Sequence, residues 1–77
     1  MSPVHPGEIL DELYLKPFGM SAGRLAKSLG VPRTKIERLV AGQTALPTDT
    51  ALQLAKAFNT TPQYWENMQA NYDLATT

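Results

Sequence analysis

A glycine at position 30 joins two short apolar patterns of helical spacing, and no other feature of the sequence constrains the fold as strongly. Apolar residues recur at this spacing on both sides of the glycine: Leu25, Ala26, Leu29, Val31, Ile36 and Leu39. Glycine permits the left-handed backbone that ends a helix in a sharp turn, and a residue as small as Ala26 lets two crossing helices approach closely. Residues 21–42 therefore predict a helix-turn-helix motif rather than an unrelated helical hairpin.

Residues 6–15 carry the signals of a helix that precedes this motif. Pro6 suits the first helical position, and the acidic residues that follow it interact favourably with the positive end of a helix. Pro17 and Gly19 mark its end. On a regular α-helix, one face of this segment collects Ile9, Leu10, Leu13 and Tyr14, which we expect to point into the core.

Capping signals place the remaining helices. Ser21 is a good N-cap for the second helix, and Gly42 is the expected stop of the third, which begins near Arg33. The fourth helix is expected over residues 48–58, and the fifth is expected to start at Thr61. No segment shows the period-two alternation of a half-buried strand, so we expect an all-α fold, a five-helix bundle with loose ends at residues 1–4 and 75–77.

The chain of 77 residues, 43% of them hydrophobic, is expected to form one domain around one core. Its stability is expected to be marginal, and the absence of cysteine excludes disulfides and zinc–thiolate sites as supplements, which leaves oligomerisation. No segment resembles an export signal or a membrane span, so a cytoplasmic protein with no membrane partner is expected.

The net charge is zero, but the charges are segregated along the chain. All seven cations lie between residues 16 and 56, where the only acids are Glu37 and Asp49, so this segment carries +5. The acids of the first fifteen residues are Glu8, Asp11 and Glu12. A basic middle with acidic ends is compatible with a DNA-facing surface and a separate surface for another partner. On charge alone, a solvated exterior with no partner is the favoured explanation.

The third helix places its polar residues where a recognition helix reads DNA. With Ile36, Leu39 and Val40 directed inward, its first turns remain outside. Arginine can bond guanine in a bidentate manner, threonine can contact a thymine methyl group, and glutamate can accept from cytosine. The candidate base-contacting residues are Arg33, Thr34, Lys35, Glu37 and Arg38.

Contacts to the DNA backbone are expected from the flanks of the motif, at Ser21, Lys27, Gly42, Gln43 and Thr44. Because phosphate contacts supply most of the non-specific affinity, a surface with so few cations should bind weakly as a monomer. A homodimer that reads two half-sites about 34 Å apart would bind more tightly. The candidate dimer-interface residues form an apolar stripe on the fifth helix: Trp65, Met68 and Tyr72.

An enzymatic function has little support in the sequence. His5 is the only histidine, and no cysteine or suitably spaced acid accompanies it, so no metal site is expected. No serine or threonine has a local histidine base, and no glycine-rich phosphate loop occurs. We therefore expect neither a catalytic residue nor a cofactor.

The chain resembles the HigA-type antidote family of addiction modules, with a helix-turn-helix of the Cro and λ-repressor class. The resemblance is carried by HPGEIL at 5–10, RLAKSLGVPRTKIERLVAG at 24–42, TDTALQLAKAFNTTPQYW at 48–65 and QANYDL at 69–74. Two positions depart from the family pattern: Ala22 stands where relatives often have glutamine, and AGQT at 41–44 replaces a basic turn. Both departures lower the expected DNA affinity.

The resemblance implies a dimer that binds a palindromic operator upstream of its own module and neutralises a small ribonuclease toxin of the HigB type. Two alternatives stay open at this point. One is a transcriptional regulator without a toxin partner, and the other is a toxin-binding module with weak or no affinity for DNA.

Overall fold

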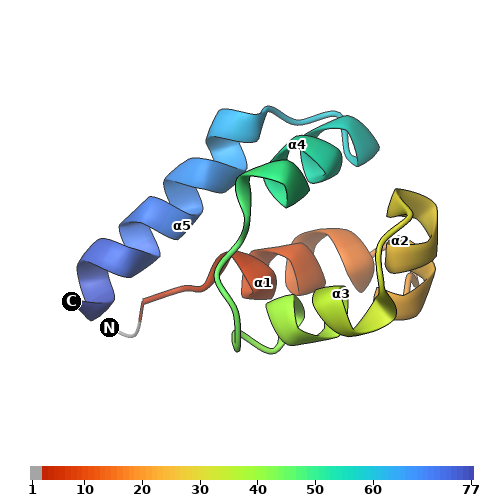
Figure 1. The fold of residues 1–77 in the computed structure, drawn as a ribbon, viewed down its shortest axis with the longest axis horizontal. Coiled ribbons are helices and arrows are strands. Elements are labelled where there is room, and N and C mark those ends of the chain that lie inside the picture. The colour runs from red at the N-terminus through yellow and green to blue at the C-terminus, as the bar shows by residue number, and fades with distance from the viewer. Residues whose placement is uncertain (1–2) are drawn as a thin grey trace.

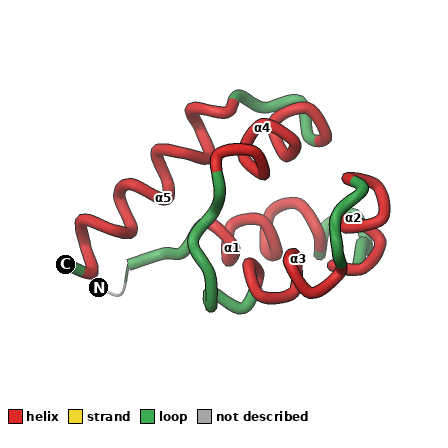
Figure 2. The backbone as a smooth tube through the Cα atoms, viewed as in Figure 1, coloured by secondary structure: helices red, strands yellow, loops and turns green. Residues whose placement is uncertain are grey.

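The computed structural model describes residues 3–77, and these residues form helices and loops with no strand (Figure 2). The elements are α1 (Pro6–Ile9), which continues as a π-helical segment η1 (Leu10–Leu15), then α2 (Ala22–Leu29), α3 (Arg33–Val40), α4 (Thr48–Ala57) and α5 (Pro62–Thr76). With α1 and η1 counted as one helix, the prediction of five helices is confirmed.

The ends of the chain differ in part from expectation. The expected loose end at residues 75–77 is wrong, because α5 continues to Thr76. The hydroxyl groups of Thr76 and Thr77 donate to the carbonyl oxygens of Tyr72 and Asp73, which satisfies acceptors that a helix end leaves open. Of the other expected loose end, Met1 and Ser2 lie outside the described residues.

Local capping accounts for where the helices begin and end. The Ser21 Oγ accepts a hydrogen bond from the Arg24 N–H at 3.1 Å, and the Thr61 Oγ1 accepts one from the Tyr64 N–H at 3.2 Å. The backbone φ of Asn59 is 54°, so this residue provides the left-handed stop after α4. The two predicted N-caps are confirmed.

α1 is fixed at its start by His5 and pressed against α3 at Gly7. The His5 Nδ1 accepts from the Gly7 N–H at 2.9 Å, and its ring meets the Tyr72 ring edge-on, with 4.8 Å between the centroids. A Cβ atom on Gly7 would lie 1.8 Å from the Leu39 carbonyl oxygen. Only glycine therefore lets the backbones of α1 and α3 approach this closely.

The π-helical segment changes which side chains of the first helix are buried. Its hydrogen bonds join residues five apart, as in the bond from the Lys16 N–H to the Asp11 carbonyl at 2.9 Å. Leu10 and Leu15 are consequently both buried, whereas the side chain of Leu13 is exposed. The expectation that Leu13 faces the core is wrong because it assumed regular α-helical spacing throughout.

The helices pack around one apolar core. α1 lies in the middle, with α3 along one edge of the molecule and α4 on the opposite side, while α5 extends away from the body (Figure 1). Side chains from η1, from α2 to α5 and from the loop before α4 meet in the core: Leu10, Leu15, Leu25, Ala26, Ile36, Leu39, Leu46, Ala51, Leu54, Ala55 and Trp65. Two glutamines fasten the periphery, since Gln53 donates to the Leu29 carbonyl and Gln69 accepts from the Leu46 N–H.

An aromatic cluster joins η1 to the turn between α4 and α5. The Tyr14 ring lies 4.9 Å from Phe58 and 5.3 Å from Trp65, measured between centroids. Its hydroxyl group lies 3.4 Å from that of Tyr64. This hydrogen bond, with a contribution from burial, raises the pKa of Tyr14 to about 12. The Tyr14 hydroxyl group is therefore harder to ionise than that of an ordinary tyrosine.

Candidate nucleic-acid interface

α3 has a buried face that fixes it and an outer face that is open to solvent. Ile36 and Leu39 are buried in the core, and Val40 is half-buried. Arg33, Thr34 and Arg38 are exposed on the outer face, and Lys35 and Glu37 are half-buried. All five candidate base-contacting residues thus have accessible surface along one edge of the molecule (Figure 1).

Both helices of the motif end in the same hydrogen-bonded turn. After α2, the Val31 N–H bonds to the Ala26 carbonyl, and Gly30 has a left-handed φ of 72°. After α3, the Gln43 N–H bonds to the Arg38 carbonyl and the Gly42 N–H to the Leu39 carbonyl. These are Schellman turns, in which a residue in the left-handed region, here a glycine, ends the helix.

The turn after α3 limits which of the expected backbone-contacting residues have groups free to contact DNA. The N–H groups of Gly42 and Gln43 are already used inside the protein. Gly42 therefore shapes the turn and has no remaining donor of its own, while the Gln43 side chain and Thr44 are exposed and available. Ser21 and Lys27 are exposed on α2, as expected for backbone contacts.

Two cations on the outer face of α3 are held by carboxylates. The Arg33 Nε donates to the Glu37 Oε2 at 3.1 Å, one turn along the same helix. The Lys35 Nζ lies 3.6 Å from the Asp49 Oδ2, in the first turn of α4. Arg38 makes no ion pair with any residue between positions 3 and 77. The resting surface is consequently less positive than its lysines and arginines alone suggest.

A shallow groove of about 280 Å³ lies between the outer face of α3 and the loop that leads to α4. Thr34, Lys35 and Arg38 line it from the helix, and Thr44 and Pro47 from the loop and the start of α4. The groove thus brings three candidate base-contacting residues and one candidate backbone-contacting residue together on one surface.

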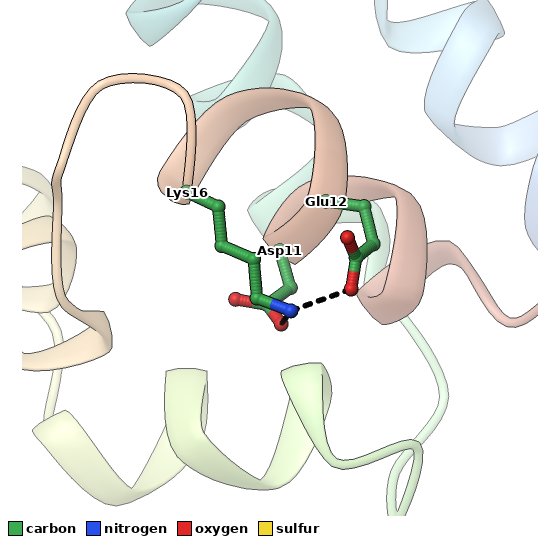
Figure 3. Close-up of polar contacts among 3 residues, drawn as sticks. All are labelled: Asp11, Glu12 and Lys16. Atoms are coloured by element: carbon green, nitrogen blue, oxygen red, sulfur yellow. Dashed lines mark hydrogen bonds and ion pairs between the residues drawn. The ribbon is translucent and has the colours of Figure 1, made fainter.

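Lys16, the first cation of the basic segment, is paired with acids of the first helix. The Lys16 Nζ lies 2.6 Å from the Glu12 Oε1 and 3.5 Å from the Asp11 Oδ2 (Figure 3). The hydrogen bond to Glu12, with the charges of both acids, raises the pKa of Lys16. Lys16 therefore offsets the acidic segment and adds nothing to the outer face of α3.

The expected dimer-interface residues do not all lie at the surface. Trp65 has no exposed surface, and its Nε1 donates to the Thr60 Oγ1 at 2.7 Å, so its expected place between subunits is corrected to the core of one chain. Met68 and Tyr72 are half-buried. They line a largely apolar groove of about 500 Å³ together with Pro3, Val4, Ile9, Asn71 and Ala75.

Two residues on neighbouring helices contact the outer face of α3 and were not predicted from the sequence. A Cβ atom on Gly23 would lie 3.3 Å from the Arg33 Cδ, so this glycine leaves room for the arginine side chain. Asp49 was noted only as an acid within the basic segment, yet it pairs with Lys35. The sequence separation of Gly23 from Arg33, or of Lys35 from Asp49, does not predict these contacts, because each contact joins two different helices.

Residues 3–77 hold neither a cluster of metal ligands nor a membrane-spanning helix. No group of three or more histidine, aspartate or glutamate side chains is placed to hold a metal ion. No helix there combines the length and the apolar character needed to cross a membrane.

The chain is similar to proteins of known sequence and structure over nearly its whole length. The helix-turn-helix family matches residues 12–65. Virulence-associated protein I of Dichelobacter nodosus is 50% identical over 74 residues, which are 96% of this chain and 68% of that protein.

Two solved structures share both sequence and fold with it. An addiction module antidote protein of a HigA family from Coxiella burnetii is 45% identical, with a TM-score of 0.93, and the match covers 99% of this chain and 83% of that one. The Pseudomonas aeruginosa antitoxin HigA, solved with the higBA promoter, is 39% identical, with a TM-score of 0.94, and the match covers 96% of this chain and 80% of that one. The chain belongs to the HigA antitoxin family of helix-turn-helix proteins.

Proposed function

We propose that this protein is an antitoxin that represses the operator of its own module and neutralises a HigB-type toxin by direct binding. The observation that carries the proposal is the outer face of α3, where Arg33, Thr34 and Arg38 are exposed while Ile36 and Leu39 anchor the helix from below. This geometry suits insertion of α3 into the major groove. The relative from Pseudomonas aeruginosa, an antitoxin solved with promoter DNA, supports the same role.

The candidate DNA-contacting residues divide into two groups in this proposal. Arg33, Thr34, Lys35 and Arg38 read base edges, with Glu37 beside them. Ser21, Lys27, Gln43 and Thr44 contact the phosphate backbone and set the position of the protein on the duplex. Gly42 keeps its place in the interface as the turn that presents its neighbours.

We infer that the protein binds DNA as a homodimer. Of the three cations on the outer face of α3, Arg33 and Lys35 are paired with carboxylates of the chain itself. Because affinity for DNA rises with each phosphate that a cation neutralises, two copies are needed for tight binding. The groove beside Met68 and Tyr72 is the apolar surface we assign to the second subunit. In this arrangement the two α3 helices lie about 34 Å apart and read a palindromic operator.

We expect the protein to act in the cytoplasm, without a cofactor or a catalytic centre.

The experiment that tests the DNA role is a gel shift on the upstream region of its own gene, at several salt concentrations, with random DNA as competitor. A specific complex that weakens steeply with salt is expected. No specific complex at any salt concentration would leave only a protein-binding role.

The toxin-binding role needs a separate test. Co-expression with the product of the adjacent gene is expected to yield a complex that copurifies and to restore growth. Failure of both, with operator binding intact, would identify the protein as a regulator without a toxin partner.

A further inference from the structure

The Arg33 side chain is held in place before any DNA arrives. Its Nε donates to the Glu37 Oε2 at 3.1 Å, although the side chain is 73% exposed. A surface arginine normally samples many rotamers, and fixing them costs conformational entropy on binding. Contacts that restrict Arg33 in the free protein lower that cost.

The second contact comes from α2. A Cβ atom on Gly23 would lie 3.3 Å from the Arg33 Cδ and 3.4 Å from its Nε. The arginine side chain therefore lies close over Gly23, where a Cβ atom would be in tight contact with it and would displace it slightly. Gly23 is inside a helix, where alanine is intrinsically more favourable, so the glycine has a local cost that this contact explains.

The hydrogen bond to Glu37 also decides which donors of Arg33 stay available. A guanidinium group carries five N–H donors in a planar fork. The bond to Glu37 uses the Nε edge and leaves the outer edge, formed by the two Nη groups, without a partner among residues 3–77. Two parallel donors on that edge match the O6 and N7 acceptors of guanine in the major groove.

We propose that Glu37 and Gly23 are positioning residues, which together fix the Arg33 guanidinium so that its outer edge meets a guanine in each half-site of the operator. The inference rests on the proposed DNA-binding function. It also changes the role of Glu37, which acts on DNA through Arg33 instead of accepting a hydrogen bond from cytosine. The pairing explains how an acid is accommodated on this face, since an uncompensated carboxylate there would repel the phosphates.

The test measures how strongly binding depends on guanine N7. Operator duplexes carry 7-deazaguanine, which lacks the N7 acceptor, at one guanine at a time. For the unaltered protein, one position in each half-site is expected to lose affinity by about tenfold. Arg33→Ala is expected to abolish this sensitivity, which identifies the guanine that Arg33 reads.

The decisive variants leave Arg33 in place. Glu37→Ala is expected to remove most of the N7 sensitivity, and Gly23→Ala, whose Cβ displaces the Arg33 side chain slightly, is expected to remove a smaller part of it, while their affinity for random DNA stays the same or rises. Glu66→Ala, which removes an acid from α5, is the charge-matched control and should keep the full sensitivity. Thermal unfolding confirms that the variants fold, and Gly23→Ala should be at least as stable as the unaltered protein.

Two results would overturn the proposal. One is full N7 sensitivity in Glu37→Ala, because Arg33 would then read guanine unaided. The other is a Glu37→Ala variant that no longer distinguishes cytosine from other bases at one operator position but keeps its sensitivity to guanine N7. Glu37 would then contact a base directly. Absence of any specific complex with the unaltered protein would instead refute the proposed function itself, and the two failures are therefore distinguishable.

Discussion

The two faces of α3 are held by different kinds of interaction. On the inner face, Ile36 and Leu39 are buried, and the Leu39 carbonyl touches the backbone of α1 at Gly7. On the outer face, Arg33 and Lys35 are each held by a single carboxylate, and the Arg33 side chain stays largely in contact with water. Burial stabilises by kilocalories per side chain, whereas an exposed ion pair contributes little.

This difference indicates a division of labour within one helix of eight residues. The inner face determines where the helix lies, and it tolerates few changes because the interior is close-packed. The outer face can change its sequence without loss of the fold, so it is free to determine which DNA is bound. Substitutions on the inner face should therefore alter stability, and those on the outer face should alter DNA recognition.

The largest effect is expected for Gly7→Ala, which tests the inner face. The added Cβ would overlap the Leu39 carbonyl oxygen and force α1 and α3 apart. We expect a loss of about 3 kcal/mol in the free energy of unfolding and a fall in Tm of about 10 °C or more, measured by circular dichroism. An unchanged Tm would show that the close approach of the two backbones does not constrain α3.

Arg33→Ala tests the outer face and is expected to separate recognition from stability. Loss of a bidentate contact should weaken operator binding by about 1 to 3 kcal/mol and relax the preference at one base position, with the Tm nearly unchanged. Lys27→Ala is the matched control, because a phosphate contact should weaken binding to all sequences alike. Equal losses for Arg33→Ala on operator and random DNA would contradict a base-reading role.

His5→Ala tests whether the inner face depends on the cap of α1. The variant loses the acceptor for the Gly7 N–H and the contact with the Tyr72 ring, so a loss of about 1.5 kcal/mol in stability is expected. His5→Asn restores the cap alone and should recover about half of this loss. Urea unfolding measures both variants, and equal stability of the two would show that the cap contributes nothing.

Asp49→Asn is expected to have the smallest effect and to sharpen the description of the outer face. The ion pair with Lys35 is 3.6 Å long and the Asp49 side chain is 72% exposed, so stability should change by less than about 0.5 kcal/mol. Release of Lys35 and removal of an acid should raise affinity for random DNA by about threefold at low salt. Fluorescence anisotropy measures this affinity. A lower affinity of Asp49→Asn than of the unaltered protein would mean that Asp49 aids binding.

Much of the fold could be predicted because its signals are local. The caps at Ser21 and Thr61 and the left-handed turn at Gly30 depend on residues within a few positions of each other. The face of the first helix was mispredicted at Leu13, because no local signal indicated that hydrogen bonds in η1 would join residues five apart. Helical periodicity assumes a regular helix, and it fails where the helix changes type.

The outer face was predictable as a set of residues but not as a set of contacts. Burial of Ile36 and Leu39 was enough to place Arg33 outside. The contacts from Gly23 to Arg33 and from Asp49 to Lys35 join helices whose relative positions the sequence does not specify. The pair formed by Arg33 and Glu37 had the favourable spacing of one helical turn, and that signal could have identified it.

The most direct test of the account asks which surface of the protein lies in the groove of the operator. The chain contains no cysteine, so a single cysteine can carry a DNA-cleaving iron chelate at Thr34 on α3 or, as a control, at Gln63 on α5. We predict that the Thr34→Cys conjugate cleaves the operator at two places about 34 Å apart and that the Gln63→Cys conjugate does not. Cleavage by the α5 conjugate alone, or equal cleavage by both, would contradict the claim that the outer face of α3 reads DNA.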